Sequence, residues 1–142
     1  MTQHLEPQPE TETHATFRLL GDMLDPEEVS RALGITPTIA RRKGDTYGNP
    51  KRPVVSRTGI WALESEGAVA GADLEAHLGF LLNQLVFKAS VVAKLIQGGL
   101  TGDILCYWMS GTGQGGPALG AETIRRIASL GVGLEFDCYS AV

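Results

Sequence analysis

The stretch Asp25–Gly34, DPEEVSRALG, is the clearest structural signal in the chain and sets the order of elements around it. Its first residue, an aspartate, can cap a helix, and the proline after it suits the first helical position. Val29 and Leu33 recur at helical spacing and give the helix an apolar face. The glycine at its end can adopt the left-handed conformation that stops a helix. We therefore predict a short helix over residues 26–33.

Toward the N-terminus, apolar and polar residues alternate from Thr16 to a turn at Gly21-Asp22, which predicts a strand. Residues 1–14 are polar and acidic, carry two prolines and show no apolar periodicity. Such composition is typical of a disordered tail. We expect a tail over residues 1–14 and a single folded domain over residues 15–142.

Toward the C-terminus, residues 38–59 are rich in glycine and proline and are expected to be irregular, apart from a short edge strand at Val54-Val55. Between Asp73 and Gly98, apolar residues recur at three- and four-residue steps, which predicts one helix of about 24 residues. The remaining patterns predict strands over residues 60–64, 104–109 and 134–139 and a second amphipathic helix over residues 121–130.

This order of elements predicts an α+β fold with a single, mostly antiparallel sheet covered by helices on one face. The first six elements match the ferredoxin-like βαββαβ pattern, and an extra αβ unit follows. An open doubly wound sheet is the less favoured alternative.

The composition indicates an ordinary globular protein in a reducing compartment. Of the 142 residues, 43% are hydrophobic and 20% are charged, and the net charge is −4. The two cysteines, Cys106 and Cys138, lie in apolar runs without metal-ligand or disulfide spacing, which favours reduced core cysteines. The polar N-terminus lacks the pattern of a secretory signal, and polar residues interrupt the longest apolar stretch, so we expect a cytoplasmic location and no membrane segment.

A basic segment gives the first candidate site. Residues 41–57 carry a net charge of +5, whereas the remainder of the chain carries −9. Such a segment can bind an acidic protein or small anion, can bind nucleic acid with an aromatic ring stacking on a base, or can be a solvated loop held by internal ion pairs. The candidate residues are Arg41, Arg42, Lys43, Tyr47, Lys51, Arg52 and Arg57.

A glycine-rich loop gives a second, weaker candidate. Residues 111–116 read GTGQGG, follow a predicted strand and precede a helix, and Asp137 lies at the next strand. This resembles the fingerprint of dinucleotide-binding loops, but four residues separate the last glycine from the helix and too little chain follows for a large α/β domain. A flexible connection is the alternative. The candidate ligand loop contains Gly111, Gly113, Gly115 and Gly116.

Catalytic and metal-binding patterns do not emerge from the sequence. His77 is the sole histidine in the predicted folded part, and the motifs of serine hydrolases and zinc proteases are missing. We expect no enzymatic activity, no cofactor and no metal site.

Several of these motifs together resemble domain-of-unknown-function family 4279, a group of small bacterial domains. The similarity covers about residues 15–140, and the family has no established activity or catalytic residues to transfer. It implies one compact domain, and its members resemble immunity or accessory proteins that bind another protein. The motifs are Gly21-Asp22, Asp25–Val29, Leu33-Gly34-Ile35, Pro37, Lys43-Gly44-Asp45, Trp61, Asp73-Leu74-Glu75 and Phe136-Asp137-Cys138-Tyr139.

The sequence leaves three functional hypotheses open. The favoured one is a non-enzymatic protein-binding module, of immunity-like or accessory type, that binds an acidic partner. The second is nucleic-acid or anion binding through residues 41–57. The third is nucleotide or small-ligand binding at residues 111–116.

Overall fold

The computed structural model describes residues 9–142, in which four helices and seven strands are found. Five strands form one sheet in the order β2–β5–β1–β6–β7, and β3 and β4 pair with each other in a separate two-stranded sheet. In chain order the elements are β1 Glu12–Gly21, α1 Pro26–Leu33, β2 Ile39–Arg41, β3 Thr46–Tyr47, β4 Val54–Val55, β5 Gly59–Glu64, α2 Leu74–Gln84, α3 Ala89–Gln97, β6 Thr101–Ser110, α4 Ala121–Leu130 and β7 Gly133–Ser140.

The helix α1 has the predicted bounds and the predicted caps. The Asp25 carboxylate accepts hydrogen bonds from the amides of Glu27 and Glu28, at 3.1 and 3.4 Å. Gly34 ends the helix with φ +69°, a conformation that costs glycine little. Val29 and Leu33 are buried in the core, so local capping and tertiary packing agree on this element.

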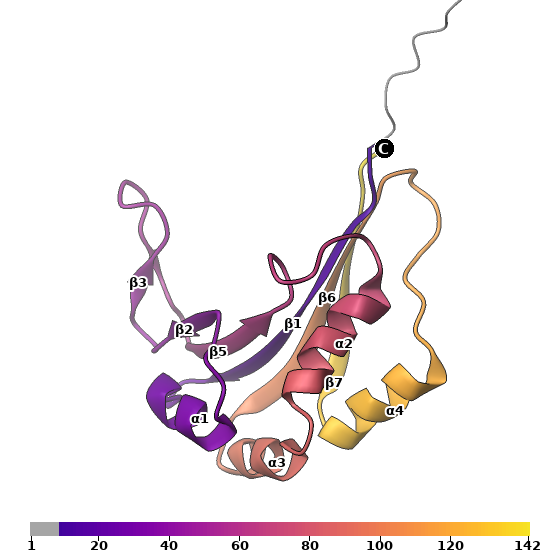
Figure 1. Cartoon of the computed structure of the whole chain (residues 1–142). Helices are drawn as coiled ribbons and strands as arrows, with labels where there is room; N and C mark the ends of the chain where they lie inside the picture. The colour runs from indigo at the N-terminus through magenta and orange to yellow at the C-terminus, as the bar shows by residue number, and fades with distance from the viewer. Residues whose placement is uncertain (1–8) are drawn as a thin grey trace, which may run out of the picture.

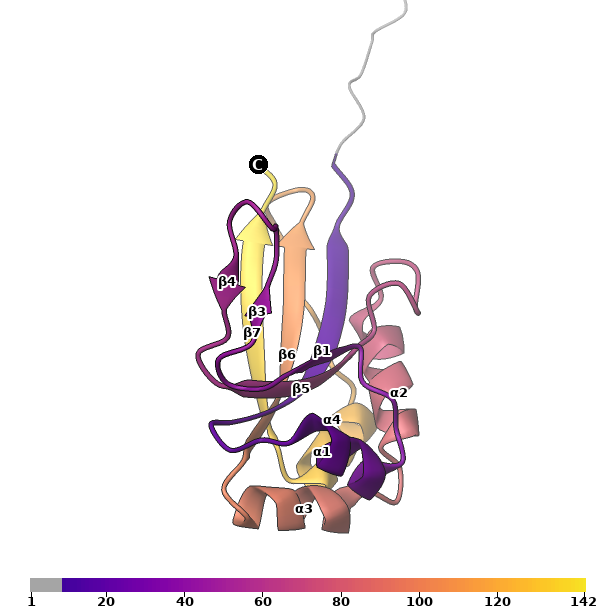
Figure 2. The same ribbon diagram turned by 90° about the vertical axis from the view of Figure 1, so that its left-hand side faces the viewer.

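The core lies between the sheet and its helices. In Figure 1, α2 and α4 lie against one face of the sheet, and α1 and α3 lie at its lower end. Phe17, Trp61 and Ile104 are fully buried on this face, and Trp61 donates from Nε1 to Ser30 Oγ at 3.0 Å. Trp61 is thus a core residue, as its place in a strand predicts. No helix among the described residues covers the opposite face, which we call the open face of the sheet (Figure 2).

The predicted long helix is wrong, because the structure divides it into α2 and α3, bent by 82° from each other. Leu85 caps α2, and Phe87 takes a left-handed conformation with φ +65° at the bend. The bend carries α3 around the end of the sheet, where Val92 is fully buried. Tertiary packing therefore overrides an apolar periodicity that runs through the bend.

No single helix in the described part of the chain is long and apolar enough to cross a membrane. The helices α2 and α3 reach the required length and composition only when they are taken together across their bend.

The start of the folded domain also differs from the prediction, because β1 begins at Glu12 rather than at Thr16. Glu12, Thr13 and His14, assigned to the tail, pair with β6. Thr13 is buried and donates from Oγ1 to the Tyr107 carbonyl at 2.6 Å. These polar residues show no apolar alternation, so the sequence gives no signal for the strand. Residues 1–8 of the predicted tail lie outside the described residues.

Residues 38–59, expected to be irregular except for Val54-Val55, form β2, β3 and β4. Val54-Val55 is a strand, but it pairs with Thr46-Tyr47 rather than with the edge of the main sheet. The edge is instead β2, which pairs with β5. The prediction missed β2 and β3 because both are very short.

The α+β class and the mainly antiparallel sheet are confirmed, with β6–β7 as its parallel pair. The specific ferredoxin-like topology is not confirmed. In the main sheet β5 lies between β1 and β2 and is antiparallel to both. The final α4 and β7 supply the additional αβ unit that the sequence predicts.

Candidate functional site

The basic residues lie on a hairpin that leaves the sheet between β2 and β5. We call residues 41–57 the basic arm. Its strands pair as Thr46 with Val55 and Tyr47 with Val54. At the base, the Gly44 amide donates to the Ser56 carbonyl at 2.8 Å, and at the tip Asn49 makes the turn by accepting from Lys51 and Arg52 amides. Figure 1 shows the arm projecting away from the main sheet.

Two basic residues fasten the base of the arm to α1 and the preceding turn. Arg42 lies 2.9 Å from Asp25 and 2.5 Å from Glu27. Lys43 lies 3.1 Å from Asp22, and its hydrogen bond lowers the pKa of that carboxyl. These are the internal ion pairs considered as an alternative for the segment. They hold the arm in place and leave Arg42 and Lys43 less free to bind a partner.

Arg41 and Tyr47 stack on each other at the foot of the arm. The Arg41 guanidinium lies 3.7 Å from the centre of the Tyr47 ring, a cation–π contact. Beside them is a hollow of about 250 Å³ between the arm and the main sheet, lined also by Val54, Arg57 and Ile60. The Arg41 Nε–H is buried and has no acceptor among the described residues.

The other three basic residues, Lys51, Arg52 and Arg57, are exposed and form no ion pair within the part of the chain that the structure describes. Between them lie Val54 and Val55, with 46% and 58% of their surfaces exposed. The arm therefore presents exposed cations beside apolar side chains, a composition suited to recognition of an acidic surface.

The open face carries aromatic rings and acidic groups. His14 stacks on Tyr107 with 4.7 Å between ring centres, and Tyr139 lies 5.6 Å beyond Tyr107. Tyr139 donates to Asp137 at 3.2 Å, which raises the pKa of its phenol. Arg18 is bound by Asp103 through two hydrogen bonds of 2.7 and 2.8 Å, which raise the pKa of Arg18. Its charge is therefore already matched.

The glycine loop connects β6 to α4. A side chain at Gly111 would collide with the backbone of Pro9, so this glycine allows the N-terminal segment to pass closely. At the start of α4, the Gly120 amide and the Thr123 hydroxyl both donate to the carboxylate of Glu75 from α2. These bonds lower the pKa of Glu75. The position where a dinucleotide phosphate would bind is thus occupied by a side chain of the protein itself.

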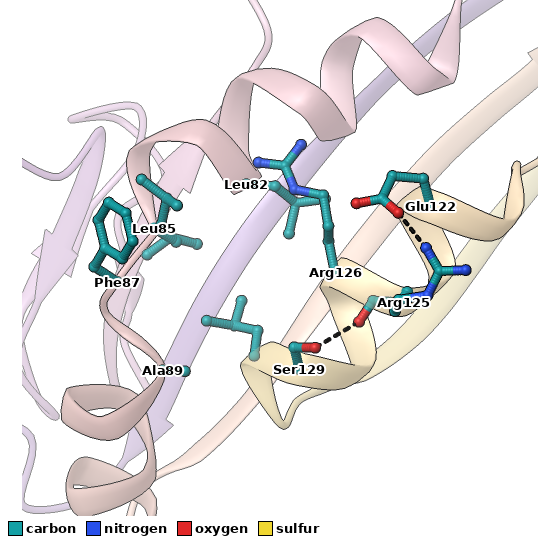
Figure 3. A pocket seen from close by; sticks show the side chains of 10 residues that line it. Leu82, Leu85, Phe87, Ala89, Glu122, Arg125, Arg126 and Ser129 are labelled. Atoms are coloured by element: carbon teal, nitrogen blue, oxygen red, sulfur yellow. Dashed lines mark hydrogen bonds and ion pairs between the residues drawn. The ribbon is translucent and has the colours of Figure 1, made fainter.

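Sequence reasoning missed a hollow at the bend between α2 and α3, because it predicted a continuous helix there. The hollow, of about 220 Å³, is lined by Leu82, Leu85 and Phe87 on one side and by residues of α4 on the other (Figure 3). Phe87 is 92% exposed. Arg126 lies between the helices and donates to Asn83 at 2.8 Å. No glycine or proline marks this bend in the sequence.

His77 and Cys106 are buried, whereas Cys138, expected in the core, is exposed. His77 is 1% exposed, and its Nδ1 and Nε2 lie 2.7 Å from Ser65 Oγ and 2.9 Å from the Gly71 carbonyl. Burial raises the pKa of Cys106 to about 12, whereas Cys138 is exposed on β7. The described residues contain no group of three or more histidine, cysteine or acidic side chains able to hold a metal ion.

The fold defines a small α+β domain with a one-sided helical cover and a projecting hairpin. The family described as "Domain of unknown function (DUF4279)" matches residues 11–141, nearly the whole chain. The protein belongs to this family, as its motifs indicated. No curated protein and no solved structure matches the chain.

Proposed function

We propose that the protein is a non-enzymatic binding module that uses its basic arm to bind an acidic protein partner. One observation carries the proposal: Lys51, Arg52 and Arg57 are exposed and have no ion-pair partner among the described residues, on a hairpin that projects from the sheet. Three exposed cations on one projecting hairpin give it a local positive potential that attracts an acidic surface.

The apolar part of the arm supports a protein partner rather than a free anion. Val54 and Val55 are exposed beside the cations, and Tyr47 remains 39% exposed under Arg41. Protein interfaces combine apolar contact with a charged rim, and complementary charges steer the encounter.

Nucleic acid is the less favoured ligand. Arg41 already stacks on one face of Tyr47, so that face is closed to a base. The aromatic residues of the open face lie beside Asp137 and Glu135, whose charges would repel phosphates. We therefore expect the arm to recognise carboxylates presented on a folded protein.

The test is affinity capture from a nuclease-treated lysate of the source cells, comparing two variants of equal charge change. In the arm variant, Lys51, Arg52 and Arg57 are replaced by glutamate. In the control variant, Arg31, Lys88 and Lys94, which lie on α1, just before α3 and on α3, are replaced by glutamate. Thermal unfolding establishes that both variants fold.

We expect a stoichiometric protein to be captured by the wild type and the control but not by the arm variant. With that protein purified, the arm variant should bind at least roughly tenfold more weakly, because opposing charges now meet across the interface. Equal capture by both variants would remove the arm from the site. Binding to an oligonucleotide that weakens steeply with salt would instead establish nucleic acid as the ligand.

A further inference from the structure

The two edges of the main sheet differ sharply in how they are protected. The edge strand β2 has three residues and follows Pro37 closely, and such short edges resist pairing with other chains. The edge strand β7 has eight residues, GLEFDCYS, without lysine or proline. Phe136 and Tyr139 are 45% and 53% exposed on it, and Cys138 is exposed too. β7 thus has the features of a strand that pairs further.

The backbone groups available at this edge follow from the pairing of β7 with β6. The Ala141 amide donates to the Ser110 carbonyl of β6 at 2.9 Å. In a strand, every second residue directs its N–H and C=O to the same side, so Tyr139, Asp137 and Glu135 also face β6. Leu134, Phe136, Cys138 and Ser140 therefore direct their amides and carbonyls to the free edge.

We propose that β7 pairs antiparallel with β7 of a second copy of this chain, about a two-fold axis, and joins two five-stranded sheets into one. Antiparallel pairing of one edge with itself satisfies the two-fold symmetry of most homodimers. Both helical layers then lie on the same side of the joined sheet. The exposed side chain of Phe136 lies on that side, because Phe136 is level with the buried Cys106 in the register of β6 and β7.

The acidic residues of β7 select the register. With Asp137 at the axis, two aspartates would face each other, and with Phe136 at the axis, Glu135 would face Asp137 of the other copy. With Cys138 at the axis, Asp137 instead faces the Tyr139 hydroxyl of the other copy, and Phe136 faces Ser140. This register keeps every carboxylate away from a directly opposed carboxylate, and among the registers that do so it pairs the longest stretch, from residue 134 to residue 142.

The interface does not involve the basic arm. The arm leaves the sheet between β2 and β5, whereas β7 lies at the other end of the strand order. A second copy is favoured over an unrelated strand because this register meets the two-fold symmetry and opposes no two carboxylates directly. Dimerisation and partner binding can therefore succeed or fail separately.

The first experiment measures mass by sedimentation equilibrium over a range of concentrations, with reductant present. The wild type should show a reversible monomer–dimer equilibrium, and the Cys138→Ser variant should keep it. Cys138→Lys places two ammonium groups opposite each other at the axis and should yield a monomer. The control is Ala40→Lys, an exposed position on the other edge strand, β2, which should dimerise like the wild type.

The second experiment reads the register by oxidative cross-linking. Opposed residues of a hydrogen-bonded antiparallel pair have Cα atoms about 5.5 Å apart, within the range of a disulfide. The wild type should therefore cross-link rapidly through Cys138. The variant that carries both Phe136→Cys and Cys138→Ser should cross-link far more slowly, because residue 136 lies opposite Ser140. Cys106 is fully buried in both proteins.

A wild type that stays monomeric at every concentration overturns the proposal, and so does a Cys138→Lys variant that dimerises as strongly as the wild type. Faster cross-linking at position 136 than at position 138 would contradict the register. Because the arm variant of the preceding subsection leaves β7 intact, its dimerisation should be unchanged even if its partner is lost.

Discussion

Ser65 and His77 form a buried polar chain in which each hydrogen-bonding group is used. The Ala15 amide donates to Ser65 Oγ at 2.8 Å, and Ser65 Oγ lies within hydrogen-bond distance of His77 Nδ1. A tautomer protonated at Nε2 satisfies every partner, since Nε2–H then donates to the Gly71 carbonyl. Ser65 is fully buried, so the pair fixes β1, the loop after β5 and α2 to one another and is not an exposed nucleophile.

We predict that Ser65→Ala lowers the free energy of unfolding by about 1–3 kcal/mol, because it leaves the buried Ala15 amide and His77 Nδ1 without partners. Denaturant unfolding measures the change. Ser90→Ala, on the exposed surface of α3, is the control and should change stability little. A loss no larger than that of the control would show that the polar chain adds nothing to stability.

Phe87 is strained and exposed at the same time. Its φ of +65° is unfavourable for a side chain with a β-carbon, and its exposed ring gains little from packing. We predict that Phe87→Gly keeps the fold and raises the free energy of unfolding by roughly 0.5–1 kcal/mol. Thermal or denaturant unfolding tests this. Marked destabilisation would mean that the ring makes contacts that its exposure does not reveal.

Among the elements, α2 and α4 are joined by the carboxylate of Glu75, which accepts from Gly120 and Thr123 at the start of α4. The lowered pKa of Glu75 means that the folded state favours the charged carboxylate. Its contribution to stability is therefore fully present above the ordinary pKa of glutamate. It is lost as the pH falls through the lowered pKa of the folded state.

We predict that Glu75→Gln lowers the thermal midpoint at neutral pH and that this difference from the wild type shrinks as the pH falls below the ordinary glutamate range. Melting curves of the two proteins at a series of pH values give the comparison. Glu122→Gln is the control, since the Glu122 carboxylate pairs with Arg125 on the exposed surface of α4. A difference that stays constant with pH would contradict the role of the Glu75 charge.

Elements whose limits depend on local chemistry were predictable. The caps of α1 and the glycine that ends α4 gave both helices their observed bounds. The bend at Phe87 was not predictable, because apolar periodicity continues through it and no helix-breaking residue marks it. The first residues of β1, Glu12 to His14, were missed for the opposite reason. They are polar, and they are held in the strand by pairing with β6, which lies far away in the sequence.

The candidate site was predictable in position and only partly in detail. A charge count over the whole chain places the basic segment at residues 41–57. It cannot show that Arg42 and Lys43 pair with acids near α1, or that Lys51, Arg52 and Arg57 form no ion pair with the residues that the structure describes. Those facts depend on how the arm packs. The hydrogen bonds from the start of α4 to Glu75 likewise depend on tertiary packing, which the sequence alone does not reveal.

For the whole molecule, the position of β1 governs the order in which the chain can fold. This first strand lies in the middle of the sheet, and the residues that pair with it extend to Glu64 in β5 and to Met109 in β6. During synthesis, Phe17 and Leu19 therefore emerge long before the strands and helices that cover them. Pairing over such separations is slow, since a long loop must close first. The nascent chain should stay open, and dependent on protection from aggregation, until β6 leaves the ribosome.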